Sequence, residues 1–166
     1  SDGAPELKKA ARALGWLHGD ATPHRPSSNG VIERFIRKIV ESARASLAQA
    51  GFHPSLWPLA LEYAAFASNI EVDLDDDGLS PYSRRFPEKG EFPGERLPFG
   101  SLVEFKPADP ETKELPKFGP RGVPGIFLGY HTAPGGAWHD DYLVVPLDEV
   151  DLESYESFRA SFRYPK

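Results

Sequence analysis

Residues that could bind phosphate groups or a metal ion gather around the start of one strongly patterned helix. The stretch TPHRPSSNGVIER, residues 22–34, is a run of turn formers that leads into apolar and charged residues with helical spacing. Small polar side chains beside the free amides of a helix amino terminus suit a phosphate oxygen. A lone acid, Glu33, falls in the first turn, where the helix dipole favours negative charge. The residues that we expect to contact phosphate groups are Arg25, Ser28, Asn29, Arg34, Arg37, Lys38 and Arg44.

These residues also have a purely structural interpretation. Glu33 alone complements the helix dipole and can pair with Arg37 one turn later, and basic residues on a helix usually form a solvated face. Basic residues outnumber acidic ones between Lys8 and Arg44, although the net charge of the whole chain is −6. Because phosphate contacts require concentrated Lys and Arg, the acidic total restricts nucleic-acid binding to a local surface.

Hydrophobic spacing predicts three helices in the first part of the chain. Residues 5–14 have apolar side chains on one face, and Gly15 ends the pattern. Residues 30–50 carry an apolar stripe at steps of three and four, and Gly51 follows as a C-terminal cap. Residues 54–70 form the third predicted helix. The stripe of the second helix consists of Ile32, Phe35, Ile36, Ile39, Val40, Ala43 and Leu47.

The second part of the chain changes from helical to β patterning. Helical periodicity fails over residues 71–98, which predicts an irregular connector, either a domain linker or an arm that wraps a surface. The runs SLVEFKP, GIFLGYH and DYLVVPL follow, separated by Gly and Pro turns, and predict a small antiparallel barrel. The predicted fold class is therefore α+β.

Composition excludes several kinds of site. The chain has no cysteine, which rules out disulfides and thiolate zinc sites, and its five histidines show no metal-ligand spacing. It has no apolar run of the roughly 20 residues that a membrane helix needs, and no signal-peptide pattern. We therefore expect an intracellular protein, nuclear or cytoplasmic, with no membrane partner. A chain that starts at Ser1 and lacks methionine is also expected to be a piece of something longer.

Five stretches, in consistent order, resemble the integrases of retroelements, in particular those of copia-type retrotransposons. The pattern G-x-x-H-x-x-x-T-P-x-x-P-x-x-N-G-x-x-E-R, residues 15–34, resembles the approach to the last catalytic helix of that family. SDGAPEL at the start resembles its second catalytic segment, and GFHPSLWPLALEYAAFASNI resembles the next helix. SPYSRRF is similar to a short linker motif, and KFGPRGVPGIFLGYH is similar to the entry and a strand of the small β domain.

The resemblance implies a ribonuclease-H-like fold on which three carboxylates hold two Mg²⁺ (or Mn²⁺) ions. It carries the second catalytic acid onto Asp2 and the third onto Glu33, and both would be metal ligands. Two metals can activate an attacking oxygen and neutralise a leaving one in phosphodiester chemistry, and magnesium prefers carboxylate ligands. The first acid has no counterpart in this chain, and the spacing from Asp2 to Glu33 is shorter than usual. The fragment alone is therefore expected to be inactive.

The resemblance also implies a domain organisation and partners. Residues 1–70 would be the second half of the catalytic core, residues 71–98 a linker, residues 99–150 a small SH3-like β domain, and residues 151–166 a tail. The partners would be DNA, as element ends and target, together with the missing amino-terminal half of the core or a second copy of the chain. Two alternatives remain: a non-catalytic interaction or nucleic-acid-binding module derived from an integrase, and an unrelated helical and β domain.

Overall fold

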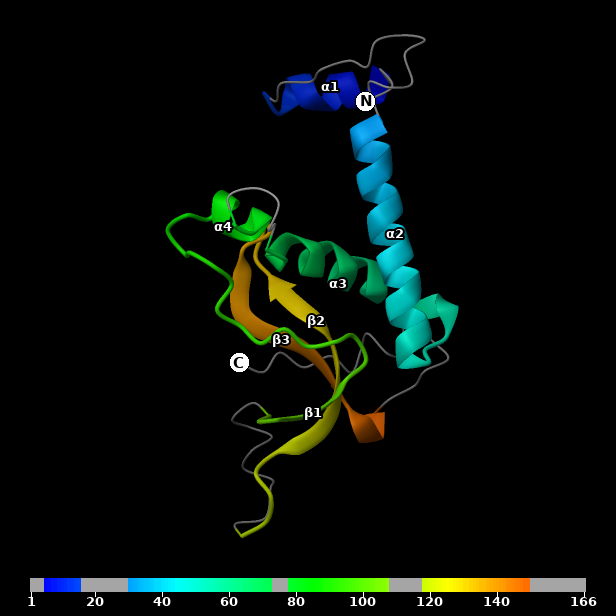
Figure 1. Cartoon of the computed structure of the whole chain (residues 1–166), viewed down its shortest axis with the longest axis vertical. Coiled ribbons are helices and arrows are strands. Elements are labelled where there is room, and N and C mark those ends of the chain that lie inside the picture. Colours follow the sequence, from blue (N-terminus) through cyan, green and yellow to red (C-terminus); the bar gives the residue numbers. More distant parts are fainter. Residues whose placement is uncertain (1–4, 16–29, 73–77, 108–117, 150–166) are drawn as a thin grey trace. The chain divides into compact units, whose positions relative to one another are not determined.

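Helices come first in the molecule and a small antiparallel sheet follows (Figure 1). The computed structural model describes residues 5–15, 30–72, 78–107 and 118–149. Segregated helices and antiparallel strands confirm the predicted α+β class. None of the described helices combines the length and the apolar composition needed to cross a membrane.

The chain divides into two compact units, residues 1–38 and 39–166, which are described separately. The boundary falls within helix α2, Gly30–Ala50, so each unit contains part of this helix. The sequence predicted a different division, into part of an integrase core, a linker and a small β domain. That division assigns segments to fold families, which the two compact units do not test, so it stays a prediction.

Helix α1, Pro5–Ala13, lies in the first unit and confirms the first predicted helix. Proline suits the first helical position because the amide it lacks would have no partner there. An acid, Glu6, occupies the first turn and a base, Arg12, the last turn, as the helix dipole favours. The helix ends at Gly15, which has φ 66° and donates its N–H to the Arg12 carbonyl.

Helix α2 has the predicted bounds and the predicted C-terminal cap. Gly51 has φ 69°, a conformation that glycine adopts without steric cost. The Gly51 N–H bonds to the Ala48 carbonyl, and the Phe52 N–H bonds to the Leu47 carbonyl. These two bonds form a Schellman motif, which satisfies carbonyls that the last turn would otherwise leave without partners.

The apolar stripe of α2 is only partly covered. Ile39, Ala43 and Leu47 are buried at successive turns of the helix. Ile32, Phe35 and Ile36, which continue the same stripe towards the amino terminus, each keep half or more of their surface exposed. The sequence therefore identified the apolar face, but it did not show that the first turns of this face remain open.

A short 3-10 turn, η2, Pro54–Leu56, leads into helix α3, Trp57–Ile70. The sequence predicted one helix over residues 54–70, and the structure differs only in this first turn. The His53 side chain caps the turn by accepting the Ser55 N–H.

Three strands form an antiparallel meander in the order β1-β2-β3. They are β1, Leu102–Phe105, β2, Val123–Thr132, and β3, Trp138–Pro146, which confirms the three predicted β runs. Gly125 of β2 has no room for a side chain, because a Cβ there would lie 2.7 Å from Val144 Cγ1 and 2.8 Å from Phe105 Cε1. A closed SH3-like barrel remains a prediction, because the described sheet has three strands.

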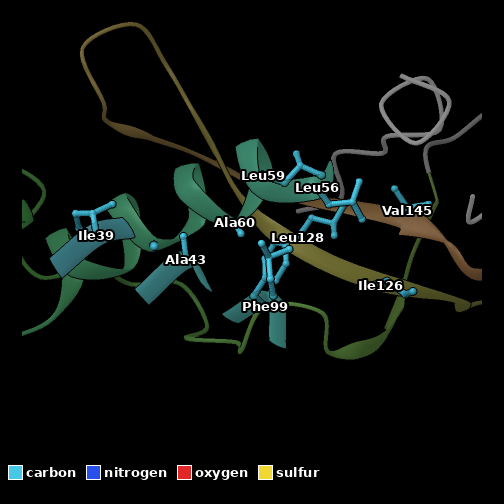
Figure 2. Close-up of a cluster of buried hydrophobic side chains, with 11 residues drawn as sticks. Ile39, Ala43, Leu56, Leu59, Ala60, Phe99, Ile126, Leu128 and Val145 are labelled. Carbon is cyan, nitrogen blue, oxygen red and sulfur yellow. The ribbon is translucent and has the colours of Figure 1, made fainter. Parts of the chain in front are cut away.

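The main core of the second unit lies between α3 and one face of the sheet, and Figure 2 shows its side chains. Leu56, Leu59 and Ala60 pack with Leu128 and other buried side chains of this cluster. The remaining members of this first core cluster are Ile39, Ala43, Leu47, Ala64, Phe99, Ile126 and Val145. Helix and sheet thus share one continuous apolar interior.

A second core cluster connects α3 to the segment that the sequence left irregular. Its buried members are Phe66, Ile70, Tyr82, Phe92 and Trp138. Tyr82 belongs to helix α4, Pro81–Arg85, which Ser80 caps by accepting the Ser83 N–H. The prediction of an irregular connector is wrong for residues 81–85, which form α4, and the linker assignment of residues 71–98 stays a prediction.

Three tyrosine hydroxyls fasten the same segment by hydrogen bonds. The Tyr130 hydroxyl donates to the Glu95 carbonyl at 3.1 Å and accepts the Leu97 N–H at 3.3 Å. The Tyr63 hydroxyl donates to the Leu97 carbonyl, and the Tyr142 hydroxyl accepts the Glu95 N–H at 2.7 Å. Burial raises the pKa of Tyr130 to about 12, and it also raises the pKa of Tyr63. These phenols therefore stay protonated as structural hydrogen-bonding groups.

Candidate functional site

The candidate site predicted from the sequence centres on Glu33, in the first turn of α2. The Glu33 side chain is exposed, so its carboxylate is open to a solvent ion or a ligand. The free amides and the dipole of a helix amino terminus favour anions at this end. A carboxylate here sits on a regular helix, which defines its position better than a loop would.

Three basic side chains of the first unit lie near Glu33 in the sequence of the same helix. Arg34, Arg37 and Lys38 are all exposed. Arg34 Nε donates to the Gly30 carbonyl at 3.2 Å, which holds its guanidinium beside the first turn. We call Glu33, Arg34, Arg37 and Lys38 the helix-start surface. Arg44, also exposed, belongs to the second unit, so its placement relative to this surface is not described.

The other predicted site residues fall outside the described part of the chain. Asp2, Arg25, Ser28 and Asn29 are among them. The predicted approach of Asp2 to Glu33, which a shared metal ion would require, therefore stays a prediction. Of the two carboxylates assigned to the magnesium site, Glu33 lies in the described part of the chain and Asp2 lies outside it.

An open apolar patch accompanies the helix-start surface on the first two turns of α2. Val31, Ile32, Phe35 and Ile36 are each half or more exposed. Exposed apolar groups scattered singly need no explanation, but a contiguous patch on one helix is typical of a surface that binds another macromolecule. Charged and apolar side chains therefore lie together on the exposed first turns of α2.

The hairpin of β2 and β3 brings together a second set of polar side chains that the sequence did not reveal. His131, His139 and Asp141 place one ligand atom each within 4.8 Å of one another. The sequence analysis found no metal-ligand spacing among the histidines, and the fold brings two of them together with Asp141. The signal in the sequence was weak, because His131 and His139 approach one another only through the register of the hairpin.

Comparison with known proteins relates the chain to distant relatives, one of which is a retroelement polyprotein. The chain is 27% identical over 128 residues to the "Retrovirus-related Pol polyprotein from transposon TNT 1-94" of Nicotiana tabacum, and the match covers 75% of this chain. It covers 9% of the polyprotein, so the chain corresponds to a small part of that protein. No family model matches the chain. No solved structure matches it either. These comparisons relate the chain to a retroelement polyprotein.

Proposed function

We propose that this chain is part of a retrotransposon-type integrase, which joins element DNA to target DNA by metal-dependent polynucleotidyl transfer. The observation that carries the proposal is the relation of most of the chain to a retroelement Pol polyprotein. The motif of residues 15–34 favours the integrase region, because its Asn-Gly-x-x-Glu-Arg segment resembles the approach to the last catalytic helix. The protein would act inside the cell, in the nucleus or the cytoplasm.

The proposal includes two fold families. Residues 1–70 would supply the later helices of a ribonuclease-H-like core, and residues 99–150 would form an SH3-like β domain. The antiparallel meander supports the second assignment, since small β barrels are built from such hairpins. The long helix that begins just before Glu33 supports the first.

The helix-start surface fits a role in magnesium binding. Glu33 provides an exposed carboxylate oxygen, which is the type of ligand that Mg²⁺ or Mn²⁺ prefers. We propose that Asp2 and Glu33 hold the ion together with an acid outside this chain. When bound, such ions activate the attacking oxygen and neutralise the leaving oxygen of a phosphodiester. Because the family's first aspartate has no counterpart here, the chain alone would be inactive.

We further propose that basic residues near the start of α2 position DNA by its phosphates. Arg34, Arg37 and Lys38 are exposed and can each contact a phosphate oxygen. The remaining residues assigned to this contact are Arg25, Ser28, Asn29 and Arg44. Such contacts would be independent of sequence and sensitive to salt.

DNA binding by the chain itself tests the phosphate contacts. The measurement is fluorescence anisotropy with a labelled duplex at a series of salt concentrations. Replacing Arg37 by Gln should lower the slope of log affinity against log salt by about 0.9, the value for one phosphate contact. Arg121→Gln, which removes an exposed cation of the second unit, should leave the slope unchanged. If the wild-type chain shows no measurable DNA affinity at low salt, the DNA-contact proposal is wrong.

Joining activity tests the catalytic assignment in a full-length protein that contains this chain. Glu33→Gln should abolish magnesium-dependent strand transfer, because the amide cannot replace a negatively charged metal ligand. Glu41→Gln, an exposed change on the same helix, should retain activity and serves as the matched control. Equal activity of the two variants would remove Glu33 from the mechanism.

The second candidate function is a non-catalytic interaction module derived from an integrase. The open apolar patch on α2 favours it, because that surface suits a protein partner without any catalytic requirement. A full-length protein that binds a partner through this patch, yet shows no magnesium-dependent nicking of DNA, would support this alternative over the integrase.

A further inference from the structure

The hairpin of β2 and β3 carries three side chains of metal-ligand type, which we call the hairpin triad: His131, His139 and Asp141. His131 lies on β2, and the other two lie on β3. Asp141 Oδ2 lies 3.5 Å from His131 Nδ1 and 3.5 Å from His139 Nδ1. The two imidazole rings are tilted by 44°, with centroids 5.5 Å apart. One carboxylate oxygen is therefore shared by two imidazole nitrogens.

The two nitrogen-to-oxygen distances of 3.5 Å are long for a hydrogen bond and close to the spacing of ligands around a metal ion, and all three ligand atoms lie within 4.8 Å of one another. A charge-assisted hydrogen bond between an imidazole nitrogen and a carboxylate is shorter, at about 2.7–2.9 Å. In a tetrahedral zinc site with bonds of about 2.0–2.1 Å, neighbouring ligand atoms lie about 3.4 Å apart. Both nitrogen-to-oxygen distances in the hairpin triad are close to this value.

The backbone of the hairpin is irregular at the triad. Strand β3 pairs His131 with Asp141 and Thr132 with Trp138, so His139 and Asp140 are extra residues opposite a regular strand. Among the described residues, Asp140 is the one non-glycine residue with a positive φ, 63°. Bulges and residues with positive φ are common beside functional groups, because they direct side chains that a regular strand would separate.

A hydrogen bond from a buried side chain holds the backbone of Asp141 in place. The indole Nε1 of Trp138 donates to the Asp141 carbonyl at 2.8 Å. Trp138 is itself buried in the second core cluster, so the position of Asp141 is fixed from the interior. The Asp141 side chain is 13% exposed, whereas His131 and His139 are 42% and 61% exposed. A metal ion could therefore enter from solvent and keep a water molecule as a further ligand.

We propose that the hairpin triad binds one late divalent transition metal ion, of which Zn²⁺ is the reference case. The ligands would be Nδ1 of His131, Nδ1 of His139 and a carboxylate oxygen of Asp141, with water in the fourth position. Two imidazoles and one carboxylate suit Zn²⁺, Co²⁺ or Ni²⁺. Mg²⁺ instead prefers an all-oxygen shell, so this site is distinct from the magnesium site proposed around Glu33.

Metal binding at the triad would link strands β2 and β3 near their turn, next to Asp141, whose carbonyl accepts the hydrogen bond from the buried Trp138. An ion that binds the folded chain more tightly than the unfolded chain shifts the folding equilibrium by mass action. We expect the thermal midpoint of the chain to rise with Zn²⁺ concentration and to fall again on addition of a chelator. The site is therefore expected to stabilise the small sheet, whether or not the chain takes part in DNA joining.

The test is isothermal titration of the whole, untagged, chelator-treated chain with Zn²⁺. The wild-type chain should bind one equivalent. His139→Gln and Asp141→Asn should each weaken binding by about 100-fold or more, since disturbing only the groups around a metal ligand already costs roughly 10- to 100-fold. Two matched controls should keep wild-type affinity: Asp140→Asn, which removes the neighbouring carboxylate, and His53→Gln, which removes a histidine elsewhere.

Spectroscopy of the Co²⁺-loaded chain gives a second readout. The wild-type chain should show the visible absorption of tetrahedral Co²⁺, and the His131→Gln, His139→Gln double variant should lose it while its far-ultraviolet circular dichroism stays unchanged. Unchanged Zn²⁺ affinity in that double variant would overturn the proposal. So would a wild-type titration that yields only the spectrum of hydrated Co²⁺, or Mg²⁺ binding that depends on the same histidines.

Discussion

The two halves of the apolar stripe on helix α2 have the same spacing but opposite environments. Ile39 is 7% exposed and belongs to the first core cluster, whereas Phe35, one turn earlier, is 50% exposed. Helical periodicity alone does not distinguish them, because both lie on the same face. What differs is the presence of packing partners, since the second half shares a core with α3 and the sheet. A hydrophobic stripe therefore identifies the apolar face of a helix, but it does not show how much of that face is covered or by what.

The comparison separates residues that hold the second unit together from residues available for binding. Buried side chains of α3 and the sheet should determine the free energy of unfolding. The open patch of Val31, Ile32, Phe35 and Ile36 should contribute little to it, and should instead affect association. Substitutions on the two sides of this division test it.

The largest expected effect is from Phe127→Ala in strand β2. Phe127 has no exposed surface, and its ring contacts those of Tyr63, Tyr130 and Tyr142. Removing it loses the transfer free energy of the ring and leaves a cavity, so the free energy of unfolding should fall by about 3–5 kcal/mol. Urea unfolding followed by circular dichroism measures this change.

Phe118→Ala is the control for this prediction. Phe118 is 96% exposed, so the same truncation should change the free energy of unfolding by less than about 0.5 kcal/mol. Similar losses for the two variants would mean that burial in the sheet core does not determine the stability of this unit.

The next effect in size is from Tyr130→Phe. The change keeps the ring but removes the hydroxyl that bonds to both Glu95 and Leu97, which should cost about 1–3 kcal/mol. Tyr142→Phe removes one hydrogen bond, the one to the Glu95 N–H, and should cost less. Urea unfolding of both variants gives the order. A larger loss for Tyr142→Phe would contradict the assignment of Tyr130 as the main fastener of this segment.

The pKa of Tyr130 adds a pH dependence to this comparison. Burial raises the pKa of this phenol to about 12 in the folded chain, whereas an unfolded tyrosine titrates near about 10. The folded state therefore holds a proton that the unfolded state loses, and stability is fully present below about pH 10 and declines as the pH rises toward 12. Unfolding of Tyr130→Phe should show a weaker decline over the same range.

The sequence was most informative where local patterning and packing agree. The bounds of α2 follow from its apolar periodicity and Gly51, and the three strands follow from short β-rich runs between glycine and proline turns. The hydrophobic residues of segment 78–98 show neither helical nor strand periodicity. Their fold depends on where the separate aromatic side chains Tyr82 and Phe92 find partners on α3 and β3.

The candidate sites show the same limit of sequence reasoning. Glu33 could be placed in a first turn, because its position depends only on where α2 begins. The hairpin triad could not be predicted from spacing, since it depends on a bulge at Asp140 and on the register that sets His131 opposite Asp141. Local rules locate residues along an element, and tertiary pairing decides which elements bring them together.

The smallest expected effect on stability, and the most informative for function, is from Phe35→Ser. Phe35 is half exposed, so the free energy of unfolding of the chain should change by less than about 0.5 kcal/mol. If the patch on α2 binds a second copy of the chain, the same change should weaken that association, which sedimentation at several concentrations measures. Trp57→Ser, an equally exposed apolar change on α3, should leave association intact. If Trp57→Ser weakens association and Phe35→Ser does not, the contact lies on α3, and the open half of the α2 stripe is only a solvent-exposed face.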